Sequence, residues 1–194
     1  MIAIVDYKMG NLRSVENALR RLGAEFTVTA DAEVIRRAER VLLPGVGNAA
    51  EAMENLREAG LVDVIRSLRQ PVLGICVGMQ VMCRHSEEGD VDCLGIFDAR
   101  VKRFESAPDV KVPHMGWNRI NNFDSKLFKG LERGSYVYFV HSFYPELCPD
   151  TIATSKHGVM FSATLKYENF YGTQFHPEKS GDVGECIIAN FLRL

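Results

Sequence analysis

The sequence predicts a single α/β domain, with a mostly parallel central sheet flanked by helices and an antiparallel extension in the second half. Short apolar segments alternate with amphipathic helical segments through the first half of the chain, joined by short loops. This alternation is typical of βαβ units, whose parallel strands are buried on both faces. The chain has 194 residues, 46% hydrophobic and 25% charged, which suits one globular domain with one core.

The first half contains four predicted strands, residues 2–6, 26–29, 41–43 and 72–75. Helical spacing in residues 12–22 lies between Asn11, suited to capping a helix, and Gly23, suited to ending one. Asp31 is placed to cap a short helix. Later helices are predicted at residues 49–59 and 61–68, divided by Gly60, and a helix-like stretch at residues 76–83.

The second half alternates differently and predicts antiparallel additions to the same core. Residues 97–104 and 159–165 alternate like strands exposed on one face, and residues 136–140 and 170–175 are further strands. Apolar positions between Val183 and Leu192 predict a closing helix. Because no linker, repeat or low-complexity stretch separates the halves, we expect one domain over residues 1–194.

Charge and terminal sequence argue against several partners. Lys+Arg 23 against Asp+Glu 25 gives a formal charge of -2, which provides no basic field for nucleic acid or an anionic membrane. Residues 1–6 lack the basic region of a signal peptide, and no run approaches the roughly 18 apolar residues of a membrane-spanning helix. We therefore expect a cytoplasmic protein with no nucleic-acid or membrane partner.

The cysteines are expected to be free thiols, because their number is odd and their spacing irregular. They are Cys76, Cys83, Cys93, Cys148 and Cys186. A zinc site is not expected around residues 76–93, since no C-x2-C pair is present. We predict no metal and no cofactor.

The most informative motif is the G-x-C-x-G of residues 74–78, where a buried strand turns into a helix. Such a turn crowds the positions two before and two after the nucleophile, so both must be glycine. The helix N-terminus favours the thiolate form of Cys76, and the amide of Val77 is placed to donate to an oxyanion. The alternative is a buried structural cysteine between two packing glycines.

A cysteine nucleophile needs a base, and the base needs an orienting group. Among the histidines, His176 ends an apolar run and precedes Pro177, which favours an extended conformation, and Glu178 follows. The carboxylate could hold one ring nitrogen while the other faces Cys76, as in a catalytic triad. The alternative is a surface histidine beside an unrelated glutamate.

Three motifs together resemble the class I (triad) glutamine amidotransferases: Pro44–Gly47, Gly74–Gln80 and Gln174–Glu178. The glycine-rich loop of residues 44–47 alone could also hold phosphate, but it lacks the spacing of known phosphate loops. Three longer blocks, residues 111–118, 138–144 and 170–181, resemble a subfamily of glutaminase subunits from histidine biosynthesis. The resemblance spans nearly the whole chain and implies a flavodoxin-like fold.

By this resemblance, Cys76 attacks the carboxamide of glutamine, His176 passes a proton to the departing ammonia, and Glu178 orients His176. The resemblance assigns the oxyanion hole to Val46, Gly47 and Val77, and the binding of substrate glutamine to Gly47, Gln80, Glu88 and the backbone around Ser142. Free glutamine carries an ammonium group that needs a carboxylate and a carboxylate that needs amide donors.

The resemblance also implies a partner, a (β/α)8-barrel cyclase that forms a heterodimer with this chain and receives ammonia through a protected channel. Ammonia released into water near neutral pH would be protonated and lost as a nucleophile. Positions that match the partner-facing residues of the family are Pro113, Met115, Trp117, Tyr138 and Lys179. The alternative is that these side chains pack within the domain. Since relatives rearrange the backbone of residues 45–47, weak activity without the partner is expected.

Two other functions remain open. The generic motifs fit equally an amidotransferase that serves another synthase or a thiol hydrolase of γ-glutamyl peptides, although the blocks around Trp117 and His141 disfavour both. A non-catalytic interaction module on the same scaffold is disfavoured by the complete set of Cys76, His176 and Glu178.

Overall fold

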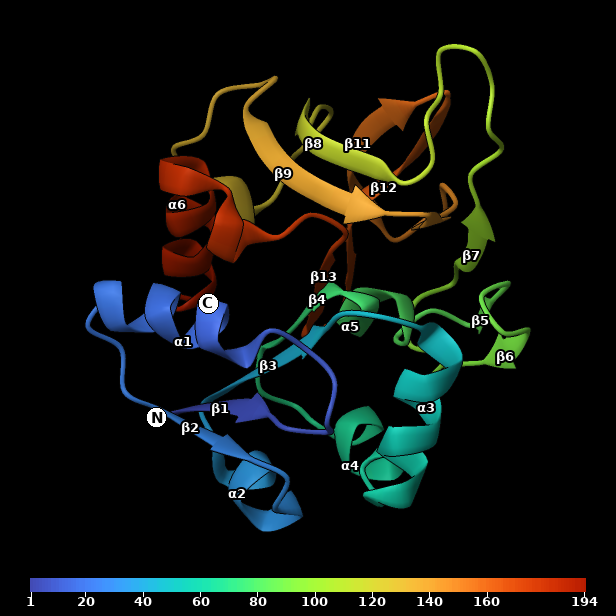
Figure 1. The fold of residues 1–194 in the computed structure, drawn as a ribbon. Coiled ribbons are helices and arrows are strands. Elements are labelled where there is room, and N and C mark those ends of the chain that lie inside the picture. Colours follow the sequence, from blue (N-terminus) through green and yellow to red (C-terminus); the bar gives the residue numbers. More distant parts are fainter.

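The computed structural model describes all 194 residues and has a seven-stranded sheet at its centre (Figure 1). Its order is β11-β12-β13-β4-β3-β1-β2. The parallel strands are β1 (Ile2–Val5), β2 (Phe26–Thr29), β3 (Arg40–Gly45), β4 (Val72–Cys76) and β13 (Phe170–Thr173). Two antiparallel strands, β12 (Val159–Tyr167) and β11 (Thr151–His157), complete one edge. The predicted α/β class and antiparallel extension are confirmed.

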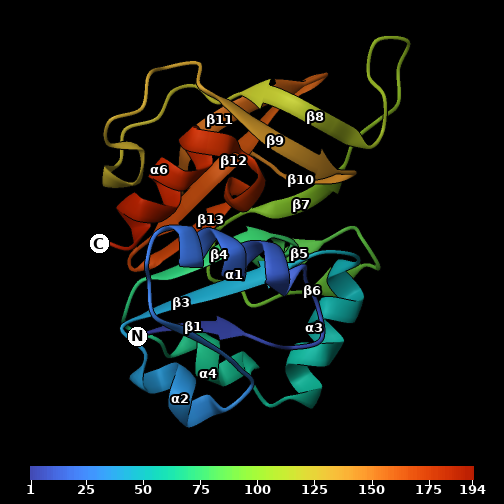
Figure 2. The same cartoon turned by 60° about the vertical axis from the view of Figure 1, so that its left-hand side comes forward.

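Helices cover both faces of this sheet, as buried parallel strands require. The helices are α1 (Leu12–Arg21), α2 (Ala32–Arg37), α3 (Ala49–Glu58), α4 (Val62–Arg66), α5 (Val77–Gln80) and α6 (Gly181–Phe191). In Figures 1 and 2, α1 and α6 lie on one face and α2, α3 and α4 on the other. Two 3-10 turns, η1 (Lys126–Phe128) and η2 (Pro177–Lys179), complete the helical elements. No helix is long and apolar enough to span a membrane.

Most predicted helix ends are confirmed. The side chain of Asp31 accepts hydrogen bonds from the backbone N–H groups of Glu33 and Val34, as expected for a cap. Gly23 and Gly60 follow helices in the left-handed conformation, each with φ of +66°. Asn11 is the N-cap residue of α1, as predicted, but its side chain makes no capping hydrogen bond.

One hydrophobic core joins the two halves of the chain. It contains 51 buried residues, which extend from Ile2 in β1 to Phe191 in α6. Large fully buried side chains such as Tyr7, Phe97 and Phe139 come from both halves. The prediction that both halves share one core is therefore confirmed.

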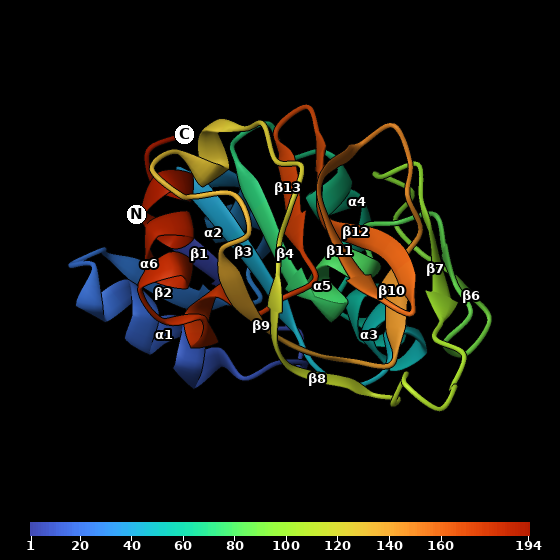
Figure 3. The same cartoon turned by 90° about the horizontal axis from the view of Figure 1, so that it is seen from above.

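The second half contains the strand predicted at residues 136–140 and a neighbouring strand, at residues 114–119, that the sequence pattern did not reveal. Strands β8 (His114–Arg119) and β9 (Tyr136–His141) form an antiparallel pair over the ends of β4 and β13 (Figure 3). The strand expected at residues 97–104 is shorter, and only Arg100–Arg103 form β7. Strand β7 belongs to a small second sheet, in which it pairs with β10 (Phe143–Pro145) and β5 (His85–Ser86), and β5 pairs with β6 (Val91–Asp92). In β8 the large apolar side chains are on the exposed face, so alternation could not identify the strand.

The stretch after Cys76 is also shorter than predicted. Helix α5 ends at Gln80, and turns carry the chain to Cys83. Helix α5 begins close against the neighbouring strand β3. The contact is so close that a Cβ atom at Gly78 would overlap the carbonyl oxygen of Leu43. Glycine at this position is therefore a packing requirement of the fold.

We predict that Gly78→Ala destabilises the fold by about 3 kcal/mol or more, because the added methyl group must displace the backbone of β3. Urea unfolding measures the loss. The control is Gly60→Ala, where φ is +66° and no atom lies within 4 Å of the added Cβ. Its cost should be only the backbone term of about 1–2 kcal/mol. Equal losses in the two variants would refute the steric explanation.

Candidate active site

The end of β4 presents Cys76 in an unusual backbone conformation. Its φ and ψ are 55° and −111°, which L-residues with side chains rarely adopt. The turn is crowded on both sides, since a Cβ atom at Gly74 would overlap Met82 and one at Gly78 would overlap Leu43. The sequence motif therefore forms the predicted strand-to-helix turn, with the cysteine at the C-terminal edge of the sheet.

His176 and Glu178 lie at the same edge, because β13 is the parallel neighbour of β4. Nδ1 of His176 lies 2.7 Å from Oε1 of Glu178, and both side chains are only 2% exposed. His176 has an extended backbone, with φ −97° and ψ 96°, before η2 begins at Pro177. The local sequence thus produces the expected histidine–carboxylate pair.

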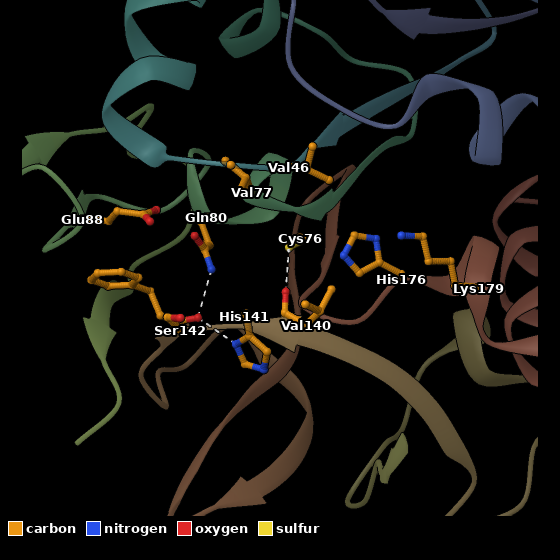
Figure 4. Close-up of a pocket in the computed structure, with 12 residues that line it drawn as sticks. Val46, Cys76, Val77, Gln80, Glu88, Val140, His141, Ser142, His176 and Lys179 are labelled. Carbon is orange, nitrogen blue, oxygen red and sulfur yellow. Dashed lines mark hydrogen bonds between the residues drawn. The ribbon is translucent and has the colours of Figure 1, made fainter. Parts of the chain in front are cut away.

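The sulfur of Cys76 faces His176 and the carbonyl oxygen of Val140 (Figure 4), and Gln174 approaches it as well. The side-chain nitrogen of Gln174 lies 3.7 Å from the sulfur, and the carbonyl oxygen of Val140 lies 4.0 Å from it. Nε2 of His176, the ring nitrogen that Glu178 does not hold, faces Cys76 and is the one left for the chemistry. The structure therefore brings Cys76, His176 and Glu178 together, although the first two are a hundred positions apart.

The surroundings of His176 favour its charged form. Burial lowers the pKa of the ring, but interactions with Cys76 and Glu178, through hydrogen bonding and charge, raise it from 6.5 to about 10. A buried histidine with a strongly perturbed pKa next to a cysteine is typical of a catalytic pair. These interactions thus favour an imidazolium, which can donate a proton.

The Cys76 thiol opens into a cavity of about 190 Å³, below the roughly 300 Å³ at which pockets for drug-sized ligands begin. Its lining includes most of the predicted catalytic, oxyanion and substrate residues: Val46, Gly47, Cys76, Val77, Gln80, Glu88, Ser142 and His176. Lys179, predicted to face the partner, lines it as well. Glu178 lies behind His176, outside the lining. Pro113, Met115, Trp117 and Tyr138 do not line the cavity.

Two of the lining side chains are held in place by local contacts. Gln80 is 2% exposed and donates from Nε2 to the carbonyl oxygen of Phe143 at 3.0 Å. One carboxylate oxygen of Glu88 accepts a hydrogen bond from the backbone of Ala49 at 2.9 Å, at the start of α3. Burial raises the pKa of Glu88, while the bond from Ala49 opposes the rise.

The remaining predicted positions form an exposed face on the β8–β9 pair beside the cavity. Met115 and Trp117 are 63% and 56% exposed, which is unusual for large apolar side chains. The Trp117 ring lies edge-on to that of half-buried Tyr138, with centroids 6.1 Å apart. Pro113 and Lys179 are also exposed. We call Pro113, Met115, Trp117, Tyr138 and Lys179 the β8–β9 face.

The family profile described as Glutamine amidotransferase class-I matches residues 3–194. The chain belongs to this family. It is 55% identical over 194 residues to imidazole glycerol phosphate synthase subunit HisH of Bacteroides thetaiotaomicron, covering 100% of this chain and 99% of the relative. A second HisH subunit, from Idiomarina loihiensis, is 48% identical over 194 residues and is covered to 97%.

The fold of this amidotransferase is shared by solved structures of low sequence identity. A putative GMP synthase protein of Thermoplasma acidophilum superposes with a TM-score of 0.76 at 24% identity, with 99% of this chain and 92% of that chain covered. A structure described as a glutamine amidotransferase has a TM-score of 0.74 at 20% identity, with coverage of 100% and 98%. These structures confirm the fold class.

Two groups beside the sulfur of the amidotransferase were not identified as site residues from sequence. Gln174 is two residues before His176, so the two share a face of the extended segment that follows β13, and that spacing was an available signal. The carbonyl oxygen of Val140 belongs to β9, and only the three-dimensional pairing of the strands brings it to Cys76. The prediction of free cysteines is confirmed for all five.

We predict that Glu178→Gln lowers the pKa of His176, because it removes one of the groups that raise this pKa to about 10. An NMR titration of the labelled histidine from pH 6 to 10 measures the shift. Since the folded pKa lies above the ordinary value of 6.5, protonation stabilises the fold fully below pH 6.5 and less as pH rises toward 10. An unchanged pKa in the variant would refute the role of Glu178.

Proposed function

We propose that this protein is the glutamine-hydrolysing subunit of an imidazole glycerol phosphate synthase and that the whole chain, residues 1–194, acts as one amidotransferase domain. The observation that carries the proposal is the convergence of Cys76, His176 and Glu178 at the cavity. The identity of 55% to a HisH subunit over the full chain supports the choice of synthase.

In the proposed mechanism, the thiolate of Cys76 attacks the carboxamide carbon of glutamine, and a C–S bond forms. His176 donates its proton to the amide nitrogen, the C–N bond breaks, and ammonia leaves a γ-glutamyl thioester. His176 then takes a proton from water, whose oxygen attacks the thioester carbon. The C–S bond breaks, and glutamate leaves with the Cys76 thiolate and the protonated His176 restored. Glu178 holds the ring through Nδ1, so that Nε2 serves both transfers.

The negative oxygen formed in each step needs hydrogen-bond donors close to Cys76. The backbone amide of Val77 is the first donor, since it begins α5 directly after the nucleophile. Val46 and Gly47 supply the second, because they follow Gly45, which pairs with Cys76 across β3 and β4. Gly47, with φ of +99°, allows the backbone there to turn toward the cavity.

Substrate glutamine fits the polar groups at the other end of the cavity. Glu88 uses one carboxylate oxygen for Ala49, which leaves the other for the ammonium group of glutamine. Gln80 and the backbone around Ser142, together with Gly47, lie where the rest of the substrate would bind. A pocket of this size and polarity accommodates an amino acid better than a nucleotide.

The β8–β9 face is the proposed docking site for the cyclase subunit, a (β/α)8 barrel that would form a heterodimer with this chain in the cytoplasm. It combines exposed aromatic and methionine side chains with one cation, a composition typical of interface cores. Its position beside the cavity would let ammonia enter a channel in the partner without crossing bulk water.

We predict that Cys76→Ala abolishes glutamine-dependent synthesis by the complex and leaves synthesis from added ammonium salt within about twofold of the wild type. The variant lacks the nucleophile but retains the docking face. Both rates are measured on the reconstituted complex with the cyclase subunit. Continued synthesis from glutamine would refute the nucleophile, and loss of both activities would indicate failed docking instead.

We predict that Trp117→Ala raises the Kd of the complex at least about thirtyfold, as expected for a buried aromatic anchor. Calorimetric titration with the cyclase measures the affinity. The control is Tyr167→Ala, because Tyr167 is similarly exposed but pairs with Phe170 at the other end of the sheet. Equal affinities of the Trp117 variant and the wild type would place the interface elsewhere.

A further inference from the structure

Two buried histidines outside the catalytic pair form a hydrogen-bonded chain: His141 lines the cavity, and His114 lies behind it. Nδ1 of His141 in β9 lies 2.7 Å from the carbonyl oxygen of Phe143. Nε2 of His141 lies 2.9 Å from Nδ1 of His114 in β8, and Nε2 of His114 lies 3.1 Å from the side-chain nitrogen of Asn118. Both rings are buried, so water cannot easily replace these contacts.

The two ends of the chain fix its direction independently. The carbonyl oxygen of Phe143 can only accept, so Nδ1 of His141 carries the hydrogen. At the other end, the side-chain nitrogen of Asn118 also donates to the carbonyl oxygen of Lys156, which fixes the amide orientation. Asn118 therefore donates to His114, and His114 donates from Nδ1 to His141. Each ring is neutral and carries its hydrogen on Nδ1.

Protonation of either ring would place two donors face to face, so the geometry itself requires the neutral forms. Burial has the same effect, lowering the pKa of His114 to about 4 and that of His141 to about 3. His114 is also clamped between the rings of His157 and Phe139, with centroids 4.2 Å and 4.8 Å away. The hydrogen bonds from Asn118 to Phe143 therefore all run in one direction, and the ring of His114 has little freedom to move.

The chain ends in the polar network around the nucleophile. The carbonyl oxygen of Phe143 accepts from both His141 and Gln80, as the two dashed lines that meet there show (Figure 4). The same nitrogen of Gln80 lies 2.9 Å from the side-chain oxygen of Gln174, whose nitrogen lies 3.7 Å from the sulfur of Cys76. The chain thus extends from Asn118 in β8 to the pocket wall of residues 140–143.

We propose that His114 and His141 are positioning residues for glutamine hydrolysis. The two neutral rings, hydrogen-bonded in one direction, hold the carbonyl oxygen of Phe143 in place, and with it the pocket wall and the side chain of Gln80. Neither ring exchanges a proton with the substrate. The proposal rests on the proposed glutaminase function. It also gives β8 two roles, since His114 and Asn118 lie on the opposite face of the strand from Met115 and Trp117.

The first test compares glutamine hydrolysis by complexes of the cyclase with His141→Leu, His141→Asn and the wild type. His141→Leu removes the donor to Phe143 and should raise KM for glutamine about tenfold with kcat changed less than about threefold. His141→Asn keeps an amide donor near the place of Nδ1 and should recover most of the lost affinity. A purely structural role would reduce the amount of active enzyme, and so the apparent kcat, at unchanged KM.

The control is His85→Gln. His85 in β5 pairs with Asp90 and Asp92 and contacts neither His114 nor His141, so it lies outside the chain. KM should stay within about twofold of the wild type. If the wild-type complex hydrolyses glutamine and His141→Leu leaves KM unchanged, the positioning role is refuted. If the wild-type complex hydrolyses no glutamine, the proposed function fails, and the positioning role fails with it.

The second test does not depend on activity or on the folding of a variant. Nitrogen NMR of the histidine-labelled wild-type complex at pH 7 should place the hydrogen on Nδ1 of both His114 and His141, with Nε2 bare in each. A hydrogen on Nε2 of either ring, or a charged ring, would overturn the chain even if the enzyme is active.

Discussion

The structure depends on one steric constraint, the close contact of backbone at the turn after β4. Cys76 adopts a positive φ of 55°, which costs free energy for a residue with a side chain. The conformation is held because glycines on both sides let α5 lie directly against Leu43 in β3. Gly45 obeys the same constraint, since a Cβ atom there would lie 2.6 Å from the buried hydroxyl of Tyr7. Cys76, the proposed nucleophile, is thus placed by backbone packing, which few side-chain motions can disturb.

Once the nucleophile is fixed at this edge, sheet topology supplies its partners. Strand β13 pairs with β4 in parallel, so the residues that follow it, Gln174 and His176, lie at the level of Cys76. Parallel neighbours end at the same edge, which is why residues far apart in sequence converge there. The dry surroundings of His176 and Glu178 then strengthen their interaction with each other and with the sulfur.

The parts of this site that could be predicted from sequence are those fixed by local rules. The turn at Cys76 and the pairing of His176 with Glu178 depend on spacings of two residues, and the parallel strands on continuous apolar runs. Strand β8 escaped prediction, although β9 did not, because Met115 and Trp117 face outward, which reverses the usual alternation. The roles of His114 and His141 escaped because the register between β8 and β9 determines their contact, and the loop that joins these strands is too long to fix that register locally.

Strand β9 connects the exposed face to the catalytic groups more directly than any other element. The carbonyl oxygen of Tyr138 accepts a hydrogen bond from the backbone of His176 at 2.9 Å, and that of Val140 lies beside the sulfur of Cys76. The hydroxyl of Ser180 closes a second link, accepting from the backbone of Tyr138 and donating to the carbonyl oxygen of His176 at 2.6 Å. A shift of β9 relative to the sheet would therefore move the base relative to the nucleophile. Strand β9 also pairs along its length with β8, which carries Trp117. A partner that binds Trp117 therefore contacts the strand next to β9, and β9 itself touches Cys76 and His176.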